Sequence, residues 1–153
     1  MGILAASLST AIEGSPISAT NIPVQVCGPC HSDLRLNERY GLDMEQVPTY
    51  ADSFHGLAAR GGVQRVANCA SCHGVHNILP SSDPASNIHS DNLAATCGKC
   101  HVGPDHPQIE VYNESKHGII YRAKVDEMNL ESDKWVAGVD YSASATCATC
   151  HMS

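Results

Sequence analysis

The chain has 153 residues, enough for one compact domain or two small lobes. Its formal net charge of −7 argues against nucleic acid and anionic membranes as partners. Aromatic residues make up only 5% of the chain, while Gly and Pro number 12 and 8. Side chains alone would therefore form a weak core, and we expect another group to fill the interior.

Residues 1–26 contain no His or Cys, and their only charged residue is Glu13. The segment is rich in Ser, Ala, Thr, Ile and Pro, so we predict an N-terminal arm. A disordered tail and an arm that packs on a neighbouring subunit are the two interpretations. The apolar run 3–8 follows no Lys or Arg, so it does not match a complete signal peptide, and we expect the remnant of a processed leader or a mature arm. No stretch approaches the ~20 apolar residues of a membrane span, and no transmembrane segment is predicted.

All eight cysteines fall into four C-x-x-C pairs, and a histidine directly follows each pair. C-x-x-C-H is the attachment signature of c-type haem, in which two thiols bind the vinyl groups and the histidine reaches the iron. We therefore predict four haems c as cofactors. The attachment residues are Cys27, Cys30, Cys69, Cys72, Cys97, Cys100, Cys147 and Cys150, and the proximal ligands are His31, His73, His101 and His151.

Cysteine pairs also occur in zinc sites, in disulfide frameworks and in thioredoxin-like motifs. Zinc needs no histidine after every pair, and a thioredoxin-like protein needs only one pair. Four such histidines by chance have a probability on the order of 10⁻⁵, which favours haem. No cysteine is left over, so no disulfide is predicted. Because haem is attached to thiols outside the cytoplasm, we expect an exported protein, periplasmic or extracellular.

Three helices are predicted from apolar periodicity and end signals, over 33–40, 49–60 and about 109–130. The second ends at a pair of glycines, and the third is the longest. The segment 79–90 is rich in Pro, Ser and Asp, and is expected to be a loop.

The pattern Tyr-x-x-Ser-x-His-Gly occurs at 50–56 and again at 112–118, each time ahead of a C-x-x-C-H motif. This echo suggests two related haem-binding lobes. We predict an arm at 1–26, a three-haem lobe at 27–106, and a one-haem lobe with a long helix at 107–153.

Five histidines lie outside the motifs, and four irons need a second axial ligand. Solvation is the default role for one unexplained histidine, but four porphyrins in a short chain favour ligation. Met44 and Met128 are competing ligands that would raise the reduction potential. The glycine after His55 and after His117 is expected to leave room for a porphyrin face. The predicted distal ligands are His55, His76, His89 and His117, with His106 as the spare.

The run from Phe54-His55-Gly56 through the second and third motifs resembles a module common in bacterial multihaem cytochromes. In that module, histidines at the positions of His76 and His89 serve as distal ligands. The stretch 115–153 is similar to part of the octahaem hydroxylamine-oxidoreductase family. That family has eight haems and a catalytic haem with an open distal face. With four motifs here, the resemblance implies the haem architecture and not the activity.

We therefore expect a mainly α and coil, haem-cored multihaem cytochrome with short helices and few or no strands. Histidine on both faces of each iron leaves no open coordination site, so electron transfer rather than catalysis is predicted. Four motifs, an arm and a motif at the chain end also resemble tetrahaem cytochromes that polymerise into extracellular filaments. That resemblance implies a homopolymer with haem contacts across subunits and a histidine lent to a neighbour.

Two other functions remain open at this point. One is a discrete periplasmic electron carrier or a redox subunit of a larger complex, with redox partner proteins or extracellular acceptors. The other is a hydroxylamine- or nitrite-type oxidoreductase, which requires a five-coordinate haem.

Overall fold

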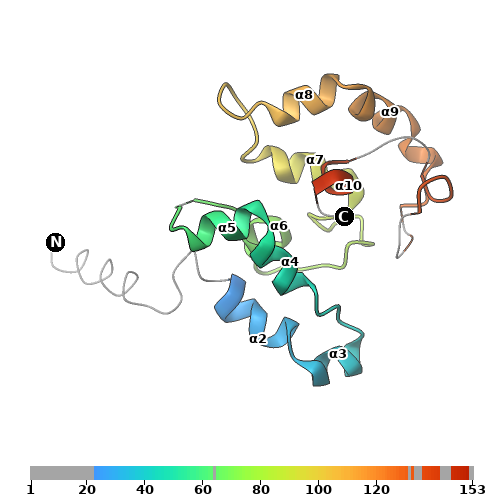
Figure 1. Ribbon diagram of the computed structural model, residues 1–153. Helices are drawn as coiled ribbons and strands as arrows, with labels where there is room; N and C mark the ends of the chain where they lie inside the picture. Colours follow the sequence, from blue (N-terminus) through green and yellow to red (C-terminus); the bar gives the residue numbers. More distant parts are fainter. Residues whose placement is uncertain (1–22, 64, 131, 133–135, 142–145, 152–153) are drawn as a thin grey trace, which may run out of the picture. The chain divides into compact units, whose positions relative to one another are not determined.

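The computed structural model describes residues 23–63, 65–130, 132, 136–141 and 146–151 (Figure 1). Residues 1–22 of the predicted arm lie outside these ranges. Within them, the only pairing of extended backbone is an isolated bridge between Ala137 and Tyr141. The helices are η1 (Pro23–Cys27), α2 (Gly28–His31), α3 (Leu34–Tyr40), α4 (Gln46–Asp52), α5 (Phe54–Arg60), α6 (Cys69–His73), α7 (Ser90–Gly98), α8 (Gln108–Glu114), α9 (Lys116–Lys124), η2 (Val125–Glu127) and α10 (Cys147–His151). This confirms the predicted fold class of short helices and coil.

The chain divides into two compact units, Met1–Ser71 and Cys72–Ser153. In the first, α2 contacts η1, α3 and α4, and α4 contacts α5. In the second, α7 contacts α8 and α10, while α9 contacts α8 and η2. Figure 1 shows α10 lying beside α7. The structure thus brings a motif near the chain end against one in the middle of the sequence.

The first predicted helix is confirmed as α3, and its ends are set by local hydrogen bonds. Asp33 caps it: the carboxylate accepts the backbone N–H of Arg35 at 2.8 Å and pairs with the Arg35 guanidinium at 2.9 Å. Gly41 ends the helix at a φ of 64°, a left-handed conformation that favours glycine. Residues 23–26 of the predicted arm, ahead of α2, are helical, because they belong to η1.

The helix predicted over 49–60 is two helices, because Ser53 bends the chain between α4 and α5. Ser53 has an extended ψ of 161°. Its hydroxyl donates to the carbonyl oxygen of Tyr50 at 2.7 Å and accepts the N–H of Gly56 at 3.1 Å. One serine therefore serves both the end of α4 and the start of α5.

The helix predicted over 109–130 is interrupted in the same way at Ser115, between α8 and α9. Its ψ is also 161°, and its hydroxyl donates to Tyr112 O at 2.7 Å and accepts the N–H of Gly118 at 3.2 Å. The prediction of one long helix in the C-terminal lobe is therefore wrong. Apolar periodicity continues through both bends, which is why it did not reveal them.

The glycine in each bend allows the two helices to approach closely. A Cβ added at Gly56 would collide with the carbonyl oxygen of Tyr50, and one at Gly118 with that of Tyr112. This is a different reason for glycine from the one expected, which was room for a porphyrin face. The repeated sequence pattern thus encodes a repeated helix–bend–helix structure that presents a histidine at the second position of the new helix.

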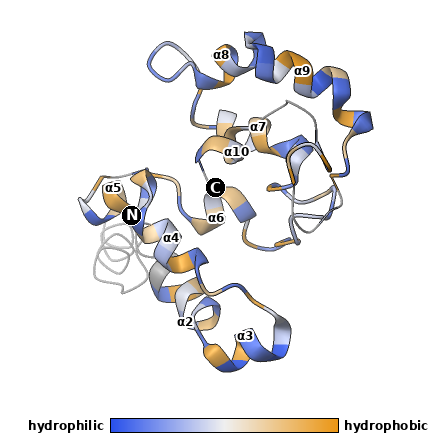
Figure 2. Ribbon diagram, turned by 45° about the vertical axis from the view of Figure 1, so that its right-hand side comes forward, coloured by the Kyte–Doolittle hydropathy of each residue, from blue (hydrophilic) through white to orange (hydrophobic). Residues whose placement is uncertain are grey.

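The chain covers very little of its own apolar surface. Among the described residues, Leu93 is the only large hydrophobic side chain that is buried. Figure 2 shows apolar segments on the exposed helices α5 and α9. Side chains this exposed need a further apolar group to cover them. The exposed large hydrophobic residues are Val26, Leu34, Tyr40, Phe54, Leu57, Val63, Val75, Ile78, Val102, Val111, Ile119, Val136 and Val139.

Candidate haem sites

Each C-x-x-C-H motif lies on or next to one helical turn. The second and fourth motifs are α6 and α10 themselves, and the first begins at Cys27 and continues through α2. In the third, Cys97 lies in the last turn of α7, and the N–H of His101 still donates to the Cys97 carbonyl at 3.0 Å. Residues three and four apart share a helix face, so each turn presents two thiols and one imidazole on one side. No disulfide joins the eight cysteines, all of which lie in the described ranges.

The third and fourth motifs are neighbours, because the Cys97 thiol forms a hydrogen bond with the Cys147 thiol. This bond lowers the pKa of Cys147 to about 6. It raises the pKa of Cys97, with burial adding to the rise. Burial also raises the pKa of Cys72, which lies close enough to Cys100 and Lys99 to feel their charges. Thiols of three motifs are therefore gathered in the second unit.

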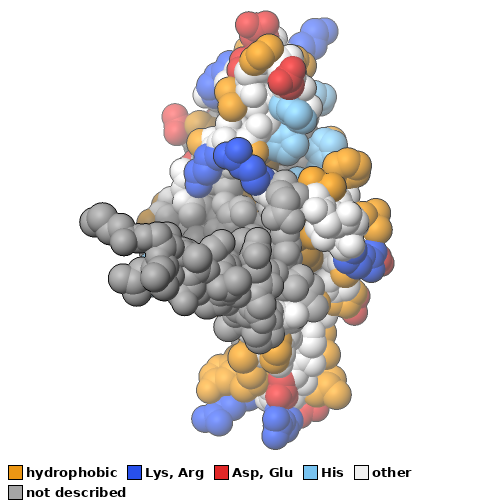
Figure 3. Space-filling view, turned by 90° about the vertical axis from the view of Figure 1, so that its left-hand side faces the viewer, with side chains coloured by type: hydrophobic (Ala, Val, Ile, Leu, Met, Phe, Trp, Pro, Cys, Tyr) orange, Lys and Arg blue, Asp and Glu red, His pale blue; other side chains and the backbone are white. Residues whose placement is uncertain are grey.

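The proximal histidines are mostly at the surface. His31, His73 and His151 are exposed, and His101 is half-buried. The ring of His106, the predicted spare, lies edge-on to that of His101 with 6.3 Å between ring centroids. Figure 3 shows histidine side chains at the surface beside apolar ones. An imidazole next to uncovered apolar surface is the environment that a porphyrin and its iron require.

Three of the predicted distal ligands lie on accessible surface. His55 is half-buried and His117 is exposed, each just after the serine that caps its helix. His76 is exposed in the segment after α6. The two bends place His55 and His117 in matching local geometries, which agrees with the repeated sequence pattern at 50–56 and 112–118.

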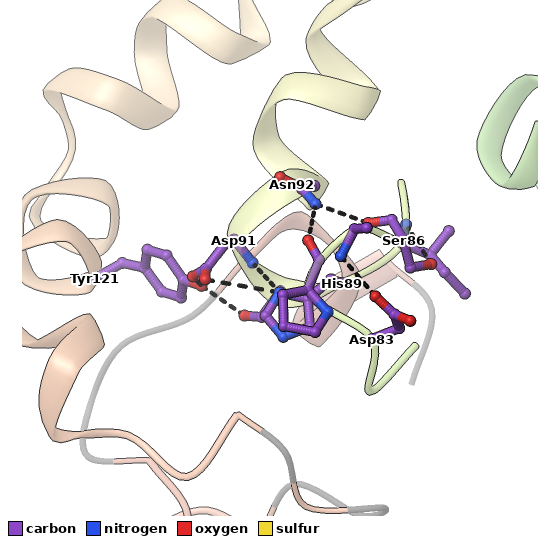
Figure 4. A network of polar contacts seen from close by, with 10 residues as sticks. Asp83, Ser86, His89, Asp91, Asn92 and Tyr121 are labelled. Atoms are coloured by element: carbon purple, nitrogen blue, oxygen red, sulfur yellow. Dashed lines mark hydrogen bonds and ion pairs between the residues drawn. The ribbon is translucent and has the colours of Figure 1, made fainter. Parts of the chain in front are cut away.

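His89 differs from these, because it is buried with 3% of its surface exposed. Its Nε2 atom has no hydrogen-bond partner, while its Nδ1 accepts the N–H of Asp91 at 3.3 Å (Figure 4). A buried polar atom without a partner is costly unless another group satisfies it. A buried imidazole nitrogen without a hydrogen-bond partner fits an axial iron ligand, so the residues present suit haem.

Sequence reasoning missed the polar groups around His89. Asp91 lies near its Nδ1 atom, with 3.6 Å between that atom and Oδ2 of Asp91. Tyr121 reaches Asp91 from α9, thirty residues along the chain. The carboxylate two residues after His89 was a signal in the sequence. Nothing in the sequence pointed to Tyr121.

Two further properties hold across the described ranges. No group of three or more His, Cys, Asp or Glu side chains is arranged to hold a single metal ion in that part of the chain. None of the helices described there has both the length and the apolar character needed to cross a membrane.

Comparison with known proteins gives a family match over most of the chain. Residues 57–153 match the family described as "Seven times multi-haem cytochrome CxxCH". The chain is also 30% identical over 142 residues to a probable nitrite reductase-hydroxylamine oxidoreductase fusion protein of Kuenenia stuttgartiensis. That alignment covers 82% of this chain but only 16% of the relative's length. No solved structure matches the chain.

Proposed function

Because this chain belongs to the family of multihaem CxxCH cytochromes, we propose that it carries four haems c and serves as a subunit of an extracellular electron-transfer filament. Electron transfer through covalently bound c-type haems is the property that membership in this family supports. The number of haems follows from the four motifs in the sequence. Attachment of haem to thiols outside the cytoplasm makes it an exported protein.

The observation that carries the proposal is the combination of four thiol pairs on helical turns with apolar side chains that the chain leaves uncovered. In each motif the two thiols form thioether bonds and the following histidine supplies the proximal ligand. Exposed residues such as Phe54 and Val139 then pack on the porphyrin and keep water from its faces. When bound, haem supplies the one-electron chemistry.

The distal ligands in this proposal are His55, His76, His89 and His117. His89 is supported by its buried, partnerless Nε2. His55 and His117 are supported by their equivalent positions after a capping serine. With histidine on both sides of every iron, no position is open to a substrate, which favours electron transfer over catalysis.

Neighbouring haems are expected where motifs meet. The contact between Cys97 and Cys147 makes the third and fourth attachment points adjacent. This adjacency within the second unit supports closely spaced redox centres, as electron transfer requires.

Electron microscopy of the purified protein tests the filament directly. We expect filaments with a regular axial repeat, and we expect deletion of residues 1–20 to abolish them while all haems stay attached. In this proposal the N-terminal arm packs on the next subunit. Discrete particles from the full chain, or intact filaments from the truncated one, would contradict the proposal. Discrete particles would favour a periplasmic carrier or a subunit of a larger complex.

A catalytic role is the second candidate, because the relative in Kuenenia stuttgartiensis is described as a nitrite reductase-hydroxylamine oxidoreductase fusion protein. The chain corresponds to 16% of that protein, and such an activity requires an iron with an open face. Carbon monoxide added to the reduced protein discriminates the two functions. A shifted haem absorption band would support catalysis, whereas an unchanged spectrum would support bis-histidine electron transfer.

A further inference from the structure

A chain of hydrogen bonds links helix α9 to the start of α7, where His89 lies (Figure 4). The Tyr121 hydroxyl donates to Oδ1 of Asp91 at 3.0 Å and lies 2.6 Å from the Ser90 hydroxyl. The other carboxylate oxygen of Asp91, Oδ2, lies 3.6 Å from Nδ1 of His89. Two consecutive residues, Ser90 and Asp91, thus contact one tyrosine from a distant helix, and Asp91 in turn lies near His89.

The direction of these bonds follows from the number of hydrogens. A phenol has one hydrogen, and Tyr121 gives it to the carboxylate of Asp91. Ser90 must therefore donate to the phenol oxygen. Burial raises the pKa of Tyr121 well above its ordinary value, so the phenol keeps this hydrogen at all physiological pH values. Ser90 is 2% exposed, so water does not compete for this contact.

Coordination of iron by Nε2 of His89 fixes where the ring proton must be. The Nε2 lone pair has to be free, so the single proton of the neutral ring moves to Nδ1. Asp91 Oδ2 is then the acceptor within reach. The contact from the Asp91 N–H, at 3.3 Å, is exchanged for a stronger charge-assisted bond to the carboxylate. A carboxylate on the second nitrogen makes the imidazole a more basic ligand, which favours ferric iron.

We propose that Tyr121 is a positioning residue, which holds the Asp91 carboxylate toward Nδ1 of His89 and thereby lowers the reduction potential of the haem that His89 binds. The inference rests on the proposed role of His89 as a distal ligand. The side chain of Asp91 is 48% exposed, so without Tyr121 it would turn into water. Tyr121 is the group that prevents this rotation.

The loop that carries His89 is held independently of Tyr121. The Asn92 side chain donates to the carbonyl oxygens of Pro84 and Ser86 at 2.9 and 2.8 Å. Thr96 donates to Asn87 O at 2.8 Å. Loss of the phenol hydroxyl should therefore leave the loop in place, and its effect should appear in the midpoint potential and g values of the haem iron.

The test compares Tyr121→Phe, Asp91→Asn and the double variant, with Tyr40→Phe as the control. Tyr40 is exposed and takes no part in this network. We expect one midpoint potential to rise in both single variants, with the larger rise in Asp91→Asn. The double variant should match Asp91→Asn, because the two residues act in series. Spectroelectrochemical titration measures the potentials, and electron paramagnetic resonance should show changed g values for the same low-spin haem.

Unchanged potentials and g values in Asp91→Asn and Tyr121→Phe, with the wild-type number of haems retained, would overturn the inference. His89→Ala separates this failure from failure of the proposed function. If every haem stays low-spin in His89→Ala, His89 is not a ligand. The distal-ligand assignment in the proposed function and the role of Tyr121 would then both be wrong. A high-spin signal in His89→Ala with no shift in the other two variants would leave the ligand assignment standing and overturn only the role of Tyr121.

Discussion

At the scale of single residues, the histidines fall into groups that differ in how far the sequence identified them. The proximal set is predicted directly from C-x-x-C-H, since covalent attachment would fix both the spacing and the ligand. The distal set remains a prediction, although the buried Nε2 of His89 supports one member. Asp91 follows His89 by two residues in the sequence, but its contact with Tyr121 could not be found there. That contact spans thirty residues and depends on how α9 packs in the second unit.

His117→Ala should convert one haem from low spin to high spin without releasing it. The iron would lose its distal ligand, whereas the two thioether bonds of that haem would be unaffected. His117 is exposed, so the substitution should cost the fold little. Electron paramagnetic resonance and mass spectrometry measure spin state and haem content. His106→Ala is the matched control and should stay fully low-spin; an unchanged spectrum in His117→Ala would point to a different ligand.

Asp33→Ala should lower the melting temperature at neutral pH by an amount that disappears in acid. The Arg35 side chain and N–H hold the pKa of Asp33 at about 2, below its ordinary 3.8. A carboxyl whose pKa falls on folding stabilises the protein above its unfolded pKa and loses that effect as pH falls through the folded one. The difference between variant and wild type should therefore shrink between pH 4 and pH 2. Melting curves across this range measure it, and a constant difference would contradict the assignment.

At the scale of elements, local signals predicted α3 and the motif turns but not the two bends. Asp33 and Gly41 mark the ends of α3 in the sequence, because capping depends on neighbouring residues. Ser53 and Ser115 carry the same kind of signal, yet apolar periodicity on both sides concealed it. The repeated Tyr-x-x-Ser-x-His-Gly pattern is visible in the sequence. That it forms a helix–bend–helix becomes clear only from the close backbone contact at its glycine.

Gly118→Ala should destabilise the protein, although alanine is normally the better residue inside a helix. Alanine gains about 0.5–1 kcal/mol over glycine in a helix interior. Overpacking costs about 1–3 kcal/mol, and here the added methyl meets the backbone oxygen of Tyr112, which cannot move alone. We expect a net loss of about 1–2 kcal/mol in the free energy of unfolding, measured by denaturant titration.

Gly61→Ala is the matched control for this prediction. A Cβ at Gly61 would lie 3.4 and 3.5 Å from its nearest carbonyl oxygens, which is ordinary contact, and its φ of −73° suits alanine. This variant should be as stable as wild type or slightly more so. Equal stability of the two variants would show that the close approach of α8 and α9 is not essential. Since the bend also sets the position of His117, Gly118→Ala should weaken the low-spin signal of one haem.

At the scale of the whole molecule, composition predicted the scarcity of buried apolar side chains that the described residues show. The scarcity of aromatic residues gave this expectation, and the single buried large hydrophobic residue among those described, Leu93, agrees with it. The division into units Met1–Ser71 and Cys72–Ser153 did not follow from the spacing of the motifs. It depends on contacts such as that between Cys97 and Cys147, which no local pattern records.

The chain should therefore be unable to hold its fold without covalently attached haem. The α-helices that the structure describes are 4 to 9 residues long, and helices below about 12–15 residues are marginal in water unless packing supports them. Among the described residues Leu93 is the only large hydrophobic side chain that is buried, so attached porphyrins have to supply the apolar contacts. Chain produced in the cytoplasm, where haem is not attached, should have much less helix by far-ultraviolet circular dichroism than the exported protein and should melt without a cooperative transition. A cooperative melt with full helix content would mean that the side chains suffice, and that haem is bound by a fold rather than forming its core.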